Sequence, residues 1–408
     1  MYVTRPLSLY RRSPECLSLP PPEGPNSGYL VLFDEESETT TCFGLCKETS
    51  IRDLPFPQNK DLIISHTITR ASDTGPQKST DYDYVVLIPV LNQPLSSNRY
   101  YVMRRRGRHK GEASTSSKEE DVTTCLCCRF INDAKPRPFD PSDEYQQVEI
   151  IHKKHGRFTA KSTVPDGHPP LYLRRKYWNV SMSTPRSYEL HEAPGIDPSL
   201  RKRLPEFNIP FSATNELVSS ETVVVGKWYC PFMFVHDQEL KLKDQLKTSM
   251  FYEVTLEQRW QKIFSCDNYN SDHKGQSNVI HVDVCVEKEQ VFIGGRFAAV
   301  VGDAKNAISD GVMWFTSRED NNRRVGLSML VAERMKWEEE RVGCRVGLDG
   351  NESSQVKVER VEEYGGAGRW SKFGCFVLVE RFVFKRMDAT ILLTYDFKHT
   401  HQIRCKWE

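Results

Sequence analysis

The stretch that decides the fold reads Thr222-Val223-Val224-Val225-Gly226-Lys227-Trp228-Tyr229-Cys230. Valine, threonine and aromatic residues fit a pleated, half-buried surface, so this stretch predicts a β-strand. Apolar runs of strand length recur on both sides of it, between turns rich in proline, glycine, asparagine and aspartate. The pattern therefore predicts a fold dominated by antiparallel β-structure. Further strands are expected at 29–33, 84–90, 99–103, 279–286, 290–293, 312–315, 375–384 and 390–397.

Two helices are expected after this strand, which makes the predicted fold class α+β. Asp237 can cap the first helix, whose apolar stripe ends at Met250. Residues 255–264 combine a capping-box pattern with apolar residues at helical spacing, and they predict the second helix. Residues 325–342 fit both a helical stripe and strand alternation. The turn-forming residues 320–322 just before them favour a strand in a hairpin.

Proline-rich breaks indicate how the chain is divided. Turn-forming residues cluster at 194–210, just before the strand at 222–230, so a boundary is expected near residue 210. The prediction is two packed modules: an N-terminal β-rich module, residues 1–210, and a C-terminal α+β module, residues 211–408, with one or two helices. Within the first module, residues 104–121 are expected to form a polar, solvated loop.

Charge and cysteine content limit the compartment and the partner. The chain has 56 Lys and Arg against 55 acidic residues, a formal net charge of +1, which argues against nucleic acid as the partner. No apolar run is long enough for a membrane span, and the first residues lack the apolar core of a signal peptide. The 12 cysteines are therefore expected to be reduced thiols in the cytoplasm, with the nucleus as an alternative. Residues 1–22 also have a slight similarity to an organelle transit peptide.

Two cysteine pairs form a candidate metal site. Cys125 and Cys128 have the two-residue gap that lets neighbouring thiolates share a tetrahedral ion, and Cys42 with Cys46 could complete four ligands. The second gap is three residues, and the pairs lie far apart in the sequence. Buried reduced thiols are the commoner explanation, and no cofactor is expected.

A second candidate group lies near the C-terminus. His399, His401 and Cys405 alternate along one face of an expected strand, because side chains at i, i+2 and i+6 point the same way. Two imidazoles and a thiolate could hold a metal ion or belong to a catalytic group. A polar edge strand, with histidines that hydrogen-bond to their neighbours, is the commoner explanation.

A run of basic residues is the candidate anion-binding site. It contains Arg104, Arg105, Arg106, Arg108 and Lys110. Such a run could bind phosphates, anionic lipid headgroups or a nuclear import receptor, and the tyrosines just before it could stack on single-stranded nucleic acid. A charged run at the end of a loop is more often only solvated.

Several longer strings are distinctive as sequences. They are MYVTRPLS (1–8), GPNSGYL (24–30), LPFPQN (54–59), VGKWYCPF (225–232), TLEQRW (255–260), ERMKWE (333–338) and LTYDFKHTHQI (393–403). Together they resemble the plant family catalogued as domain of unknown function 1262, and the resemblance runs nearly end to end. It implies a plant protein, and it implies no known activity, cofactor or catalytic residue.

Familiar catalytic signatures, such as a nucleophile elbow or a phosphate-cradling glycine loop, are missing from the sequence. The leading hypothesis is therefore a non-enzymatic intracellular interaction or binding module with a protein or small-molecule partner. One alternative is an enzyme whose site gathers sequence-distant residues such as His66, His168 and His399 with nearby acids. Another is anion or nucleic-acid binding through the basic run. Three or more titratable side chains converging in one deep pocket would contradict the binding-module hypothesis and favour the enzyme.

Overall fold

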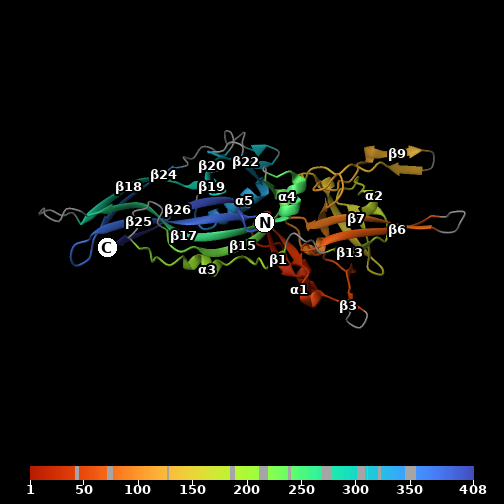
Figure 1. Ribbon diagram of the computed structural model, residues 1–408, viewed down its shortest axis with the longest axis horizontal. Helices are drawn as coiled ribbons and strands as arrows, with labels where there is room; N and C mark the ends of the chain where they lie inside the picture. The colour runs from red at the N-terminus through yellow and green to blue at the C-terminus, as the bar shows by residue number, and fades with distance from the viewer. Residues whose placement is uncertain are drawn as a thin grey trace. The chain divides into compact units, whose positions relative to one another are not determined.

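The computed structural model describes most of the chain and shows a β-rich protein (Figure 1). In the part of the chain that it describes, strands predominate and five short α-helices lie between them. This confirms the predicted β-rich α+β class. The described residues are 1–41, 46–70, 77–125, 128–183, 189–210, 219–237, 240–268, 278–300, 308–309, 311–319, 323–344 and 355–408.

Contacts divide the chain into two compact units. Unit 1 consists of Met1–Ala193, Pro231–Met233 and Leu240–Phe251. Unit 2 consists of Pro194–Cys230, Phe234–Glu239 and Tyr252–Glu408. Residues 194–210, expected to end the first module, thus share their contacts with unit 2. The division into folding modules at residue 210 stays a prediction.

Unit 1 is built on a seven-stranded antiparallel sheet in the order β12-β11-β8-β7-β6-β13-β5. Its core buries large aromatic side chains, among them Phe56, Tyr100, Phe158 and Trp178. The strands are β5 (Ser50–Ile51), β6 (Asp61–Arg70), β7 (Gln77–Pro89), β8 (Arg99–Arg104), β11 (Gln147–Lys153), β12 (Arg157–Ser162) and β13 (Asn179–Ser183).

Smaller elements complete unit 1. The strand β1 (Tyr2–Pro6) pairs in parallel with β2 (Gly28–Leu32), and two short hairpins are β3–β4 (Thr40–Thr41, Cys46–Lys47) and β9–β10 (Val122–Cys125, Cys128–Ile131). The helices are α1 (Leu7–Arg12), α2 (Leu171–Arg174) and α4 (Leu242–Thr248). Single 3₁₀ turns are η1 (Pro14–Ser18), η2 (Glu35–Ser37), η3 (Leu95–Ser97), η4 (Glu119–Asp121) and η5 (Glu144–Gln146), and η6 (Phe232–Phe234) follows β15.

Part of the segment 104–121 differs from the solvated loop that was expected. Arg104 ends β8, and residues 114–117 are buried. The buried backbone is satisfied, because the Ser117 amide donates to the His168 carbonyl at 2.8 Å and the Ser114 amide to Val102 at 2.8 Å. The hydroxyls of Ser114 and Ser117 are also paired, which lowers the cost of burying them, whereas Ser116 Oγ has no hydrogen-bond partner among the described residues.

Unit 2 contains a sheet in the order β16-β23-β22-β20-β19-β26-β25-β17-β15, antiparallel from β16 to β17. The long strands β17, β25 and β26 run side by side (Figure 1). The strands are β15 (Val223–Pro231), β16 (Val235–Asp237), β17 (Phe251–Asp267), β19 (Glu289–Ile293), β20 (Arg296–Val300), β22 (Val312–Ser317), β23 (Arg324–Ser328), β25 (Lys372–Lys385) and β26 (Ile391–Trp407).

Short strands and two helices complete unit 2. The strand β14 (Gly195–Ile196) pairs with β15, β21 (Ile308–Ser309) pairs with β22, and β18 (Val279–Glu287) pairs with β24 (Gln355–Glu363). The helices are α3 (Pro198–Arg203) and α5 (Met329–Glu340). The strand predicted at 222–230 is β15, and every other strand predicted from an apolar run is also present.

The helix predictions need correction. A helix does follow β16, but Lys241 occupies its N-cap position and Asp237 lies in the strand. Residues 255–264 belong to β17, not to a helix. This strand is buried over most of its length, so its apolar residues do not alternate with polar ones, and the sequence lacked the usual strand pattern. Residues 325–328 form β23 as expected. Residues 329–340 form α5, begun by the Ser328 side chain, which accepts a hydrogen bond from the Leu330 amide.

Candidate functional site

A group of buried, charged side chains lies on one part of unit 2, and we call it the buried charge cluster. Its members are Arg201, Glu338, Glu339, Glu380 and His399, which come from α3, α5, β25 and β26. The start of α3 is set locally, since Pro198 takes the first helical position and the Asp197 side chain caps the Leu200 amide at 2.9 Å.

The centre of the buried charge cluster is the ion pair of Arg201 with Glu380. Arg201 donates from Nε to Glu380 Oε1 at 2.9 Å and from Nη2 to Oε2, a two-pronged contact that suits a planar guanidinium. Gln258 Nε2 donates to Glu380 Oε1 at 2.7 Å. Burial acts to raise the pKa of Glu380, but the nearby His399 and the hydrogen bonds from Arg201 hold it well below its usual range. Glu380 is therefore a fixed anion.

The two glutamates at the end of α5 differ in their partners. Glu338 accepts from Arg201 Nη1 at 3.1 Å and from Arg334 Nη2 at 2.6 Å, so its charge is compensated. Glu339 is fully buried, and neither of its carboxylate oxygens has a hydrogen-bond partner among the described residues. Burial, with Glu380 nearby, raises the pKa of Glu339 to about 8.

His399 faces both remaining carboxylates with one nitrogen. Its Nε2 lies 3.0 Å from Glu339 Oε2 and 3.6 Å from Glu380 Oε2, and 2% of the side chain is exposed. Burial acts to lower the pKa of His399, but the close carboxylates of Glu339 and Glu380 outweigh it and raise the value to about 9.

A β-bulge turns His399 toward the cluster. Val377 on β25 pairs with Ile403, whereas the next residue, Leu378, pairs with His399, so three residues of β26 are left out of the ladder. Cys405 pairs with Cys375, which is three residues from Leu378 and so faces the other side of the sheet. The expectation that His399 and Cys405 share one face is therefore wrong.

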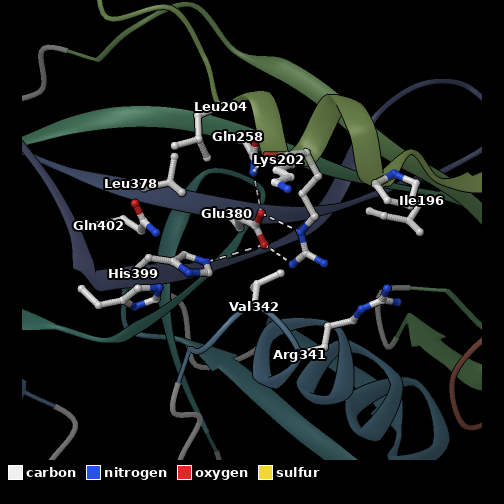
Figure 2. A pocket seen from close by; sticks show the side chains of 13 residues that line it. Ile196, Lys202, Leu204, Gln258, Arg341, Val342, Leu378, Glu380, His399 and Gln402 are labelled. Carbon is white, nitrogen blue, oxygen red and sulfur yellow. Dashed lines mark hydrogen bonds and ion pairs between the residues drawn. The ribbon is translucent and has the colours of Figure 1, made fainter.

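A cavity of about 340 Å³ opens beside the buried charge cluster. In Figure 2, Glu380 lies at its centre, with Gln258 and His399 on different sides of the carboxylate. Lys202 and Arg341 add two cations to the wall. The polar and charged lining residues are Arg201, Lys202, Gln258, Arg341, Glu380, His399, His401 and Gln402, and the apolar ones are Ile196, Pro198, Leu204, Val342 and Leu378.

Residues that could hold a metal ion also lie here. Single ligand atoms of Glu339, Cys344 and His399 all lie within 4.8 Å of one another, and all three side chains are buried. Burial raises the pKa of the Cys344 thiol to about 12, so it is a neutral thiol at neutral pH. Cys344 and Glu339 were not candidates from the sequence, because neither lies in a ligand-spacing motif.

The predicted basic run has internal partners. Arg104 Nη1 lies 2.8 Å from Asp83 Oδ1, and Arg105 Nε donates to Asp61 at 2.8 Å. The Arg106 guanidinium lies 3.6 Å from the centre of the Tyr84 ring, and Lys110 donates to the Lys243 carbonyl at 2.9 Å. Arg108 is exposed. Anion binding by this run stays a prediction. Arg106 and Arg108 would have to supply most of the contacts with the anion.

The predicted cysteine site falls largely outside the described residues. This is true of Cys42 and of the side chains of Cys46, Cys125 and Cys128. The backbone pairs Cys125 with Cys128 across the β9–β10 hairpin. Zinc binding by these four cysteines stays a prediction.

The histidines of the enzyme hypothesis are not gathered in one site. His66 and His168 belong to unit 1, and neither lines the cavity at His399. His168 Nε2 lies 3.3 Å from Glu119 Oε2. Of the three, only His399 has buried acidic neighbours.

Among the described helices, none is long and apolar enough to cross a membrane.

Comparisons with known proteins match one part of the chain to a family. No curated protein matches this chain. Similar solved structures include Cry35Ab1, at 12% identity over 86% of this chain and 90% of that chain with a TM-score of 0.43. The hemolytic lectin CEL-III matches at 10% identity over 85% and 74%, with a TM-score of 0.15. Residues 23–129 match the family described as "Protein of unknown function (DUF1262)". The resemblance to domain of unknown function 1262 is thereby confirmed over residues 23–129.

Proposed function

We propose that the protein is a binding module that takes a small anionic molecule into the cavity of unit 2. The observation that carries this proposal is the charge of the wall: Arg201, Lys202, Arg341 and His399 line the cavity with one carboxylate, Glu380, while Glu338 and Glu339 are buried behind it. His399 counts as a cation because its pKa is raised to about 9. A concave site with an excess of positive charge concentrates and holds anions.

The size and lining of the cavity narrow the ligand class. A volume of about 340 Å³ lies at the small end of the range of ligand pockets. Leu204, Val342 and Leu378 supply apolar surface beside the cations. A carboxylate or phosphate attached to a small ring or short chain would use both kinds of contact.

The partners of Glu380 favour binding over catalysis. Both of its oxygens accept hydrogen bonds, from Arg201 and Gln258, so the wall presents a fixed arrangement of charges. Such an arrangement orients a ligand without reorganisation, which is what a selective binding site needs.

Isothermal titration calorimetry with benzoate and phenyl phosphate as probes tests the proposal. Both are expected to bind, and neutral benzamide is expected not to. Lys202→Ala should weaken binding of either anion by about tenfold or more, since a hydrogen bond to a charged group contributes about 1.5–3 kcal/mol. The affinity should also fall as salt is raised.

Arg203→Ala is the matched control, because Arg203 is the next exposed cation of α3 and does not line the cavity. Its affinity for both probes should equal that of the unaltered protein. Benzamide binding as tightly as benzoate, or equal losses in the two variants, would contradict anion binding at this cavity.

The second candidate function is an enzyme, favoured by one observation. Three titratable side chains, Arg201, Glu380 and His399, converge in one cavity, as an acid–base site requires. An enzyme would consume its ligand, so NMR of a bound probe over hours separates the candidates. An unchanged probe spectrum supports binding alone.

The cellular setting is also a proposal. The lack of a disulfide among the seven cysteines whose side chains are described supports a reducing, intracellular location, in the cytoplasm or nucleus. Plant origin rests on the family resemblance alone.

A further inference from the structure

The end of α5 and the bulged strand β26 bring three different ligand types together. Glu339 is the second-last residue of α5, and Cys344 folds back toward it, because its amide donates to the Glu339 carbonyl at 3.1 Å. His399 approaches from β26. The carboxylate, the thiol and the imidazole each place one ligand atom within 4.8 Å of the other two, and all three side chains are buried.

Three polar atoms of this group are buried without a hydrogen bond to any described residue. Both carboxylate oxygens of Glu339, and Nε2 of His399, have no hydrogen-bond partner among the described residues. Nε2 and Oε2 lie 3.0 Å apart, yet they are not aligned for a hydrogen bond. Two ligands that each lie about 2.0–2.1 Å from a tetrahedral ion are about 3.3 Å apart, so this separation also suits two ligands of one metal.

Glu380 does not compete for this role. Its oxygens already accept hydrogen bonds from Arg201 and Gln258. It stands 3.6 Å from His399 Nε2, the same nitrogen that faces Glu339, so it lies beside the proposed metal position with its oxygens already occupied.

We propose that Glu339, Cys344 and His399 bind a divalent transition-metal ion, with Zn²⁺ as the metal that the ligand types fit best. Nitrogen, thiolate sulfur and carboxylate oxygen are the usual ligands of zinc, whereas Ca²⁺ and Mg²⁺ require oxygen throughout. On binding, Cys344 releases its thiol proton, His399 its Nε2 proton and the protonated fraction of Glu339 its carboxyl proton, all to solvent. Three protein ligands is the number found in zinc sites that keep one position open for water or a ligand.

This inference shares one residue, His399, with the proposed anion binding, but the two can be tested apart. The metal ligands Glu339 and Cys344 do not line the cavity, and the anion-binding residue Lys202 is not a metal ligand. Metal binding can therefore be measured with no anionic probe present. The competing metal site is the one predicted at Cys125 and Cys128.

The test is metal binding by the full chain after dialysis against a chelator. Zinc per chain is measured by inductively coupled plasma mass spectrometry, and its affinity by competition with a chromophoric chelator. Cobalt is added separately, because a thiolate ligand gives Co²⁺ a charge-transfer absorption in the near ultraviolet. The variants are Cys344→Ser and Glu339→Gln, with Cys285→Ser as the control at an exposed cysteine of unit 2.

We expect the unaltered chain to bind a zinc ion. When cobalt takes the place of zinc, its charge-transfer absorption should be lost in Cys344→Ser and retained in Cys285→Ser. Glu339→Gln, which keeps the shape of the side chain, should weaken zinc binding by more than about tenfold, since even outer-shell partners contribute about 10–100-fold. Circular dichroism of each metal-free variant separates loss of a ligand from loss of the fold, and Glu339→Gln decides the matter if Cys344→Ser does not fold.

Two results would overturn the proposal. One is the absence of bound zinc or cobalt in the folded, unaltered chain. The other is binding that survives both Cys344→Ser and Glu339→Gln but disappears in the double variant Cys125→Ser/Cys128→Ser. The second result would place the ion at the cysteine hairpin of unit 1.

Discussion

At the scale of single residues, Arg201 holds the buried charge cluster together. It compensates Glu380 and Glu338, both of which are buried. Replacing it with alanine would leave Glu380 without its main cation and Glu338 with Arg334 as its closest one, so Arg201→Ala should destabilise the protein by about 3–5 kcal/mol. Urea denaturation followed by circular dichroism measures this. Arg203→Ala, on the exposed side of the same helix, should change the free energy of unfolding by less than about 0.5 kcal/mol. Similar values for the two variants would show that the cluster is not structural.

His236 provides a separate, pH-dependent prediction. Its ring lies 5.5 Å from the Trp314 ring, and burial lowers its pKa from the ordinary value of 6.5. Between the lowered pKa of the folded protein and the pKa of 6.5 expected for the unfolded chain, the unfolded chain binds the proton more readily than the folded protein. This part of the stability is therefore present above pH 6.5 and is lost as the pH falls. His236→Phe should therefore flatten the dependence of the unfolding free energy on pH below 6.5. An unaltered slope in this variant would assign the effect to other groups.

These residues also show what could be read from the sequence. Arg201 lies in an ordinary basic stretch, and Glu338 and Glu339 follow one another in a charged run, so no local pattern marks them as buried. They meet Glu380 and His399 only through the pairing of β25 with β26 and the packing of α3 and α5. His399 alone was a candidate, because it alternates with His401 and Cys405 along an expected strand, although Cys405 in fact faces the other side of the sheet.

At the scale of elements, strands were predictable and helices much less so. Continuous runs of β-branched and aromatic residues, such as 222–230 and 375–384, can bury both faces only as strands. Burial on both faces also explains why residues 255–264 were predicted to be a helix. Apolar and polar residues do not alternate in such a strand, so apolar residues can fall at helical spacing by chance. The bulge in β26 has no sequence signal of this kind, and it reverses which residues share a face with His399.

The strand β23 offers a prediction about packing within a sheet. Gly326 pairs with His236 on one side and Trp314 on the other, and the Trp314 ring covers it. A Cβ at Gly326 would lie 2.8 Å from Trp314 Cζ3, so Gly326→Ala should cost about 1–3 kcal/mol of stability. Combining it with Trp314→Leu removes the clash with the ring but leaves Val312 Cγ1 at 2.8 Å, so the double variant should be somewhat less unstable than the two single losses predict. Strict additivity in urea denaturation would mean that the ring does not restrict this position.

At the scale of the whole molecule, the interleaving of the two units limits what sequence can reveal. Segment 240–251 belongs to unit 1, where Arg105 donates to the Leu246 carbonyl at 3.1 Å. Residues 194–210 belong to unit 2, although their proline content makes them look like a linker. A boundary drawn from composition alone falls where turn-forming residues are frequent, near residue 210. The contacts made by α3 instead assign residues 194–210, which precede this boundary, to unit 2.

The fragments 194–408 and 211–408 turn this division into a prediction. The shorter fragment lacks α3, and so it lacks the guanidinium that compensates Glu380 and Glu338. It also lacks Ile209, which packs with Trp260 and Phe376 in a buried apolar cluster. The longer fragment keeps both contacts, so it should be the more stable of the two by at least the 3–5 kcal/mol or so expected for Arg201. Circular dichroism and urea denaturation of the two purified fragments measure the difference. If residues 194–210 were only a linker, the two fragments would unfold at the same urea concentration, and the boundary near residue 210 would then be the correct one.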